Sequence, residues 1–411
     1  MSDPSRLRAV RVIVAAAFAA SLLISHRLWA GVGRSYPRVP VLGALEGAAR
    51  WAPWWEVPLA VALLALLAAL ALARTARGAE RAAAGALGVL LLLAAGDQNR
   101  WQPWAYQYAL LLLALASLHS REASALDTCR VVVALTIAWG GVQTLAGGGS
   151  ELLLPLARPL AAALGQGLLH VVIPLNTAVG LAELVVGLGL LVPRVRGPAV
   201  AGAVALQLLT LLSLGTFGVR LNAVVWPWHL ATAALVLALF RRMPAEAGPR
   251  ALLAPRPELA HGAALLLLGA LPALSLANRW DPYLSAALYS GNLGTARVQW
   301  SPDGSADADP VLPRFVTIDQ RRGDRRAVAL PAWSLADLRV PAYPAERTYL
   351  RAARQLCPRA RPTQHFTLIL RRRLTIAEVW RAYDARRRRT TPPAPERIYT
   401  CEKLGRGMRD A

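Results

Sequence analysis

Long apolar segments alternate with short polar ones over the first 277 residues of the chain. Each apolar segment is about long enough for one α-helix to cross a hydrocarbon core of about 30 Å. The pattern therefore predicts an all-α membrane bundle of about nine transmembrane helices, of which the third and fourth are the shortest. The predicted spans lie near residues 10–28, 55–74, 80–96, 104–119, 129–147, 174–192, 197–215, 222–240 and 258–277.

The composition agrees with a membrane protein, because 55% of the residues are hydrophobic and only 17% are charged. The net charge is +22, and the 46 basic residues include a single lysine, Lys403. The charges are spread along the chain and form no recognisable nucleic-acid-binding motif, so nucleic acid is not an expected partner. Membrane lipids are the expected surroundings.

The placement of arginine predicts the orientation in the cell inner membrane. The N-terminus carries three arginines, and the later loops on the same side are dense in arginine: Arg6, Arg8 and Arg11, then Arg194, Arg196, Arg241, Arg242, Arg250 and Arg256. This favours a cytoplasmic N-terminus. Nine spans then place residues 278–411 on the periplasmic or extracellular side, and a domain of this length translocates largely regardless of its own charge.

Residues 278–411 differ in composition from the preceding residues 1–277, because their apolar runs are short and Pro, Asp and Arg increase. Segments 315–319, 326–331 and 365–373 are typical of strands, and 374–389 is typical of a helix with one apolar face. We expect a small α+β domain outside the membrane that binds a protein partner. It contains Cys357 and Cys401, which either form a disulfide in an exported domain or remain two free thiols. The chain has no CxxC motif, and no metal site is expected.

The most polar stretch next to a predicted span is DQNRWQPWAYQY, residues 97–108. One interpretation is structural: the aromatic residues form a belt at the membrane surface, Asp97 pairs with Arg100, and Pro103 begins a helix. The other is a ligand pocket, because the stretch has more hydrogen-bonding groups than a turn needs. Arg100 would bind an anionic or carbonyl oxygen, with Trp104 and Trp226 stacking on a planar ring. The candidate ligand-binding residues are Asp97, Gln98, Asn99, Arg100, Gln102, Trp104, Tyr106, Gln107, Asn222 and Trp226.

Two of the titratable residues inside predicted spans are candidate catalytic groups for proton transfer. Glu183 occurs within an apolar segment, where an ionisable side chain indicates a function unless a neighbouring helix pairs with it. Candidate partners for such a pair are Gln143, Asn176 and Arg130. His229 follows Trp226-Pro-Trp and serves either local structure or proton transfer. Gln143 and Gln207 are further amides expected to be buried.

The order of these motifs resembles a known group of bacterial membrane proteins. DQNRWQPWAYQY is followed by WGGVQTL, AELVVGLGLLVP, LNAVVWPWHLA and LSAALYSGN. This resembles the HTTM module, which is shared with vitamin K-dependent gamma-carboxylases, and its DoxX-like relatives, over residues 8–295. The resemblance implies a membrane helical module and a reduced quinone as a possible cofactor. The chain departs from the family at Thr144, where a lysine is common, and at Gln207, where a histidine is often found. Glutamate carboxylation itself is therefore not expected.

Three functions remain open from the sequence. The first is a membrane scaffold or accessory protein whose domain outside the membrane binds a partner. The second is a quinone-linked oxidoreductase or carboxylase-like enzyme that uses Asp97, Arg100, Glu183 and His229 to handle protons. The third is a protein that handles lipids or small solutes and uses the polar stretch as a headgroup site. The chain shows no inverted repeat of the kind found in secondary transporters.

Overall fold

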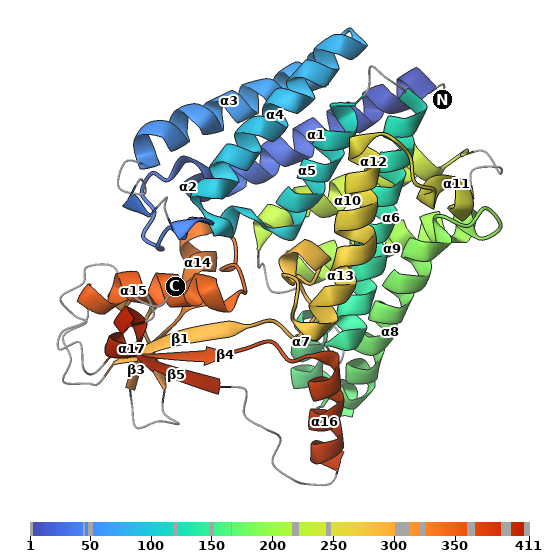
Figure 1. The fold of residues 1–411 in the computed structure, drawn as a ribbon. Helices are drawn as coiled ribbons and strands as arrows, with labels where there is room; N and C mark the ends of the chain where they lie inside the picture. The colour runs from blue at the N-terminus through green and yellow to red at the C-terminus, as the bar shows by residue number, and fades with distance from the viewer. Residues whose placement is uncertain are drawn as a thin grey trace.

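The computed structural model describes residues 3–43, 46–47, 52–117, 122–147, 152–165, 167–215, 222–243, 248–300, 312–319, 325–359, 366–387 and 396–406. A bundle of long helices occupies residues up to 277, and a small sheet with short helices follows at one end of it (Figure 1). We call these two parts the helical module and the C-terminal domain.

Seven helical segments of the described residues are long and apolar enough to cross a membrane. They are Pro4–Ile24 in α1 (Asp3–Ile24), Trp54–Leu72 in α3 (Ala52–Leu72), α4 (Ala76–Gly96), α6 (Glu122–Ala146), α9 (Arg196–Leu214), Ala223–Phe240 with α10 (Trp226–Phe240), and Leu259–Ala277, which runs from α12 (Leu259–Ala264) through α13 (Leu271–Leu274). These helices are compatible with a multi-pass membrane protein.

The other two predicted spans correspond to shorter apolar helices, so the predicted count of nine is supported only in part. They are α5 (Pro103–Leu115) and Leu175–Gly189, the second half of α8 (Gly167–Gly189). The predicted third span, one of the shortest by sequence, is the 21-residue helix α4. Pro103 occupies the first turn of α5, as predicted from its position after a polar turn. Short helices α2 (His26–Ala30), α7 (Leu154–Leu164) and α11 (Pro249–Leu253) complete the module.

Helices α6 and α8 approach each other closely because glycines line their contact. A Cβ atom on Gly141 would lie 2.4 Å from the carbonyl oxygen of Gly180, and one on Gly187 would lie 2.4 Å from the backbone nitrogen of Ala138. Small residues permit this backbone contact between apolar helices. The contact fixes the face of α8 that carries Glu183 against α6.

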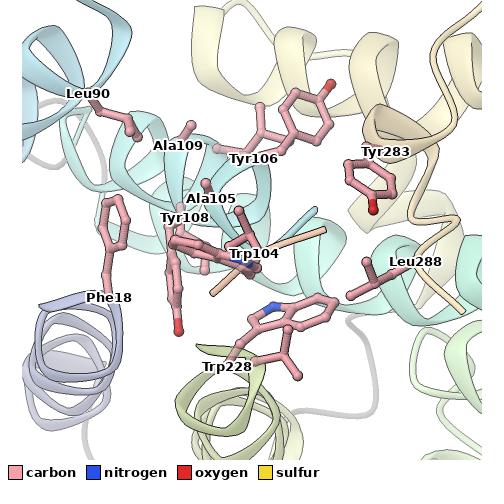
Figure 2. Packing of buried hydrophobic residues seen from close by; sticks show 14 of the residues in the cluster. Phe18, Leu90, Trp104, Ala105, Tyr106, Tyr108, Ala109, Trp228, Tyr283 and Leu288 are labelled. Atoms are coloured by element: carbon pink, nitrogen blue, oxygen red, sulfur yellow. The ribbon is translucent and has the colours of Figure 1, made fainter. Parts of the chain in front are cut away.

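The predicted aromatic belt is wrong for most of its residues, because they are packed in the core of the module. Trp104 and Tyr108 are fully buried. Tyr108 stacks on Phe18 of α1 with ring centroids 4.9 Å apart, and Trp104 meets the same ring edge-on (Figure 2). Apolar burial and ring packing therefore hold α1 against α5.

The C-terminal domain is built on a five-stranded antiparallel sheet in the order β2-β3-β1-β4-β5. The strands are β1 (Thr295–Trp300), β2 (Thr317–Asp319), β3 (Arg325–Ala329), β4 (Thr367–Arg371) and β5 (Glu396–Thr400). The predicted strands correspond to β2, β3 and β4, whereas β1 and β5 were not predicted. Helices α14 (Leu330–Leu338), α15 (Glu346–Leu356), α16 (Ile376–Arg387) and α17 (Cys401–Arg406) accompany the sheet.

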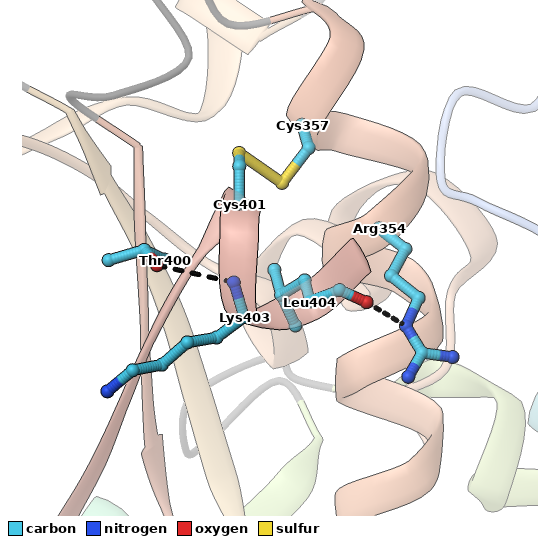
Figure 3. Close-up of a disulfide and its surroundings, with 6 residues drawn as sticks. All are labelled: Arg354, Cys357, Thr400, Cys401, Lys403 and Leu404. Carbon is cyan, nitrogen blue, oxygen red and sulfur yellow. Dashed lines mark hydrogen bonds between the residues drawn. A yellow bond between two sulfur atoms is a disulfide. The ribbon is translucent and has the colours of Figure 1, made fainter. Parts of the chain in front are cut away.

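The two cysteines of this domain form a disulfide, which is one of the two arrangements that the sequence left open. The bond between Cys357 and Cys401 links the end of α15 to the start of α17 (Figure 3). Beside it, Nε of Arg354 donates to the carbonyl oxygen of Leu404 at 2.9 Å. The bond attaches the last described helix to the rest of the domain. The third cysteine, Cys129, is buried and free in α6.

Candidate functional site

The polar stretch between α4 and α5 is buried and its charges are paired. Asp97 accepts from Nη1 of Arg34 at 2.7 Å and from the backbone N–H of Asn99 at 3.1 Å. The predicted pairing of Asp97 with Arg100 is therefore wrong in its choice of partner. Burial acts to raise the pKa of the Asp97 carboxyl, but the charges of Arg34 and Arg100 outweigh it and hold the pKa below its ordinary value.

Every nitrogen of the Arg100 guanidinium donates a hydrogen bond. Nε donates to the carbonyl oxygen of Leu28 at 2.9 Å and Nη1 to that of Leu93 at 2.6 Å. Nη2 donates to Oε1 of Glu56 at 2.6 Å, and both side chains of this pair are fully buried. Arg38 contributes a second cation to Glu56 at 3.1 Å. The guanidinium is fully buried and four of its five N–H groups donate within the chain, which leaves little of it for a ligand to bind.

The same stretch connects the helical module to the C-terminal domain. Oδ1 of Asn99 accepts from the backbone N–H of Tyr343 at 3.0 Å, and Nε2 of Gln102 donates to the carbonyl oxygen of Pro341 at 3.0 Å. Gln98 accepts from the hydroxyl of Thr348 at 3.3 Å. We call residues 97–102 with these partners the junction. Its geometry is that of a structural contact between two parts of the chain.

A cavity of about 70 Å³ lies among α6, α8, α9 and α10 and contains the two predicted catalytic residues. Part of its wall is formed by Ala286, Leu288 and Tyr289, which follow the last span. We call it the polar cavity, because eight polar or titratable residues line it: Thr136, Thr144, Glu183, Gln207, Thr210, His229, Thr232 and Tyr289. Figure 2 includes two of its other lining residues, Trp228 and Leu288.

Glu183 contacts α6 inside this cavity. Its carboxyl group accepts a hydrogen bond from the side chain of Thr144. Its Oε2 atom lies beside Gly140, 3.7 Å from the place that a Cβ atom on this glycine would take. The partners expected from the sequence were Gln143, Asn176 and Arg130. Each of these binds elsewhere: Gln143 donates to Ser275, Asn176 to the carbonyl oxygen of Val172, and Arg130 pairs with Asp127.

His229 is held by a neighbouring helix and keeps one nitrogen available. Its Nδ1 lies 2.6 Å from Oε1 of Gln207. An amide oxygen only accepts, so with the Gln207 amide in this orientation the proton is on Nδ1 and Nε2 carries the lone pair. Nε2 is buried and has no hydrogen-bond partner among the described residues. A buried nitrogen in this state is a potential base for a small group that enters the cavity.

Two neighbouring side chains also have buried atoms without partners in the described part of the chain. Gln107 accepts from Nε1 of Trp228 at 2.5 Å, while its Nε2 has no partner. Asn222 donates to the hydroxyl of Tyr289 at 2.9 Å, while its Oδ1 has no partner. Buried polar atoms in native proteins are nearly always hydrogen-bonded, so atoms left over beside a cavity indicate bound water or a ligand.

The predicted ligand-binding residues therefore separate into three places. Asp97, Gln98, Asn99, Arg100 and Gln102 form the junction. Trp104 and Tyr106 belong to the packed core, where the Tyr106 hydroxyl donates to the carbonyl oxygen of Leu267 at 3.3 Å. Gln107 and Asn222 contact lining residues of the polar cavity. Trp226 is partly buried. Trp104, its predicted partner in stacking on a ligand ring, packs on Trp29 and Phe18 instead.

Sequence reasoning did not single out Thr144 and Tyr289 as parts of a site. For Thr144, the only signal was the resemblance described above. Thr144 and Gln207 are the two positions at which the chain departs from the pattern of that family. Both line the polar cavity. No group of three or more His, Cys, Asp or Glu side chains in the described residues is arranged to hold a metal ion.

A second, apolar cavity of about 760 Å³ lies between α9 and α10 at the arginine-rich end of these helices. Val200, Leu208, Leu237 and Phe240 are among its lining residues, and two exposed arginines, Arg241 and Arg242, lie at its rim. Apolar walls beside exposed cations suit the acyl chain and headgroup of an anionic lipid.

Comparison with protein families, curated proteins and solved structures finds no match to this chain.

Proposed function

We propose that this chain is a membrane enzyme that performs general acid–base chemistry in the polar cavity, with Glu183 and His229 as the proton-transferring residues. The observation that carries the proposal is their convergence. The two titratable residues come from different apolar helices and line one small cavity. Ionisable residues within membrane spans are costly, and they usually serve function when they face a cavity.

The size of the cavity limits what enters it. Its volume of about 70 Å³ is about half that of an engineered cavity of about 150 Å³ that binds benzene. The polar cavity therefore accommodates water or the reacting end of a substrate, a group of a few heavy atoms. A quinone ring does not fit within it, and the chemistry proposed here uses no quinone.

The arrangement supplies both a base and its orientation. Nε2 of His229 accepts a proton from the entering group, and the resulting imidazolium remains bonded through Nδ1 to Oε1 of Gln207. Glu183, held by Thr144, supplies or takes the second proton. The wall residues Ala286, Leu288 and Tyr289 belong to the segment that leads into the C-terminal domain. With a cytoplasmic N-terminus, this segment follows the last span on the periplasmic side, from which we propose that the substrate enters.

The proposal is tested in cells of the native host that lack the gene. Cells are supplied with the natural protein or with Glu183→Gln or His229→Gln, and their metabolites are compared by mass spectrometry. Matched controls are Glu80→Gln on α4 and His261→Gln on α12, neither of which lines the polar cavity. We expect both cavity variants, and neither control, to accumulate the same compound while the protein level stays unchanged. Metabolite profiles identical to the natural protein in both cavity variants would contradict the proposal.

A second candidate is a scaffold or accessory protein of the HTTM type, and the junction favours it. The junction attaches the C-terminal domain to the module through buried hydrogen bonds, which is suited to presenting a partner-binding surface at the membrane. Cross-linking in intact cells tests this candidate. The scaffold candidate requires that one protein partner is cross-linked to the natural protein. This cross-link should be lost when the C-terminal domain is removed and retained in Glu183→Gln.

A further inference from the structure

An arginine of the C-terminal domain is buried against the helical module without a matching negative charge. Arg373 follows β4 and is only 7% exposed. Its Nη2 donates to Oε1 of Gln143 on α6 at 2.5 Å. Its Nε and Nη1 atoms are buried and have no partner among the described residues. An unpaired buried guanidinium destabilises a protein, so its presence indicates a partner beyond the described residues.

The carboxylates nearby are already paired with other cations. Asp281 binds Arg347 at 3.0 Å, and Glu378 binds Arg372 at 2.8 Å. Glu346 binds Arg397 at 2.9 Å and also accepts from Tyr399. Burial lowers the pKa of Arg373 to about 10, and no opposite charge counteracts this effect. The negative charge that Arg373 needs is thus absent from the described residues around it.

Arg373 lines a cavity of about 260 Å³ whose lining residues all belong to the C-terminal domain. Trp280 and three further arginines, Arg347, Arg371 and Arg372, also line it, so we call it the arginine cavity. The paired carboxylates of Asp281 and Glu346 are part of the same lining. Nε1 of Trp280 is a second buried donor without a partner in the described residues. The lining also includes Asn278, the first residue after the last apolar helix, which locates the cavity at the end of a predicted span.

We propose that the arginine cavity binds a phosphate group, held by the guanidinium of Arg373 and the indole N–H of Trp280. Phosphate oxygens are strong acceptors, and an arginine presents several donors to them in a fixed plane. The group would come from a phospholipid headgroup at the membrane surface or from a soluble phosphate ester. This site is separate from the polar cavity, and the proposal does not depend on the acid–base function.

Thermal unfolding of the full chain tests the site, with tryptophan fluorescence as the signal. The probes are inorganic phosphate against chloride at equal ionic strength in a neutral detergent, and nanodiscs of phosphatidylcholine with and without phosphatidylglycerol. We expect the melting temperature to rise by about 2–4 °C with a probe that binds. A rise with inorganic phosphate assigns a soluble phosphate, and a rise with phosphatidylglycerol alone assigns a lipid headgroup.

The variants separate ligand binding from a structural role. Arg373→Gln should remove the response and raise the melting temperature in chloride, because the unpaired charge is gone. Trp280→Phe keeps the ring and should weaken the response. Arg381→Gln, on α16 and outside the cavity, should respond like the natural protein. The proposal is overturned if the natural protein responds to neither probe, if Arg373→Gln responds equally, or if Arg373→Gln melts at a lower temperature in chloride.

Discussion

The junction and the polar cavity are both polar clusters in an apolar protein, but they differ in how their hydrogen bonds are satisfied. In the junction, all three guanidinium nitrogens of Arg100 donate, and Asp97 and Glu56 each bind a cation. In the polar cavity, Nε2 of His229 has no partner in the described chain, and atoms of Gln107 and Asn222 beside it have none either.

This difference indicates which cluster serves structure and which serves chemistry. Removing one partner from a buried ion pair is strongly destabilising, whereas an unsatisfied group has no partner to lose. Density of polar residues alone pointed to residues 97–108 as a ligand site. The folded structure reveals which hydrogen bonds are satisfied. The unsatisfied Nε2 of His229 points instead to the polar cavity, which Glu183 and His229 line.

The largest effect is expected in the junction. Arg100→Met leaves Glu56 buried with only Arg38 as a cation and should lower the free energy of unfolding by about 3–5 kcal/mol. Thermal unfolding in detergent measures the change, with Arg158→Met on the exposed side of α7 as the control. Adding Glu56→Gln to Arg100→Met should recover part of the loss. A melting temperature unchanged by Arg100→Met would remove the distinction between the two clusters.

A smaller effect is expected from the disulfide, which lies outside both clusters. The bond closes a loop of 44 residues in sequence, and its loss should destabilise the C-terminal domain by about 2–4 kcal/mol. Hydrogen exchange of Cys357→Ala with Cys401→Ala should increase in the domain and remain unchanged in α6 and α8. Increased exchange throughout the helical module would show that the junction couples the stability of the two parts.

The polar cavity should tolerate substitution much better than the junction. Glu183→Gln and His229→Gln break no ion pair in the described chain and should change the free energy of unfolding by less than about 1 kcal/mol. The same thermal assay used for Arg100→Met makes the comparison direct. A loss as large as that of Arg100→Met would mean that Glu183 and His229 are structural residues like those of the junction.

The sequence predicted most of the helical module, because apolar runs of sufficient length record a property of each segment alone. Each of the nine predicted spans contains a helix in the described residues, seven of these helical segments are long enough to cross a membrane, and Pro103 begins α5. Strands β2, β3 and β4 were recognised from their local patterns. Strands β1 and β5 were missed, since their residues pair with strands far away in sequence and β1 depends on β3 and β4 for its place.

The arrangement of the candidate site could not be predicted from local patterns. Glu183 and His229 were recognised because each is unusual in an apolar span, but their convergence depends on how four helices pack. The partners of the junction are also distant: Arg34 lies 63 residues from Asp97, and the backbone of Tyr343 lies 244 residues from Asn99. Such pairs are set by tertiary contacts that the order of residues does not reveal.

The smallest effect is expected at a satisfied polar cluster on the surface, which extends the comparison to exposed groups. At the start of α16, the backbone N–H of Thr375 donates to Oε2 of Glu378, and the backbone N–H of Glu378 donates to Oγ1 of Thr375, which is a capping box. Hydrogen bonds from Arg372 and Thr375 lower the pKa of Glu378 from 4.5 to about 2.

A carboxyl group with a lowered pKa in the folded state stabilises that state at pH values above its unfolded pKa, and this contribution is lost as the pH falls from about 4.5 toward 2. Glu378→Gln keeps the capping hydrogen bonds but not the charge, so its difference in melting temperature from the natural protein should be small at pH 7 and should shrink through this range. Because the pair is partly exposed, solvent screens it and the difference should stay well below that of Arg100→Met. A difference in melting temperature that grows as the pH falls would contradict the assigned pKa direction. A difference as large as that caused by Arg100→Met would show that exposure does not weaken a satisfied ion pair in this protein.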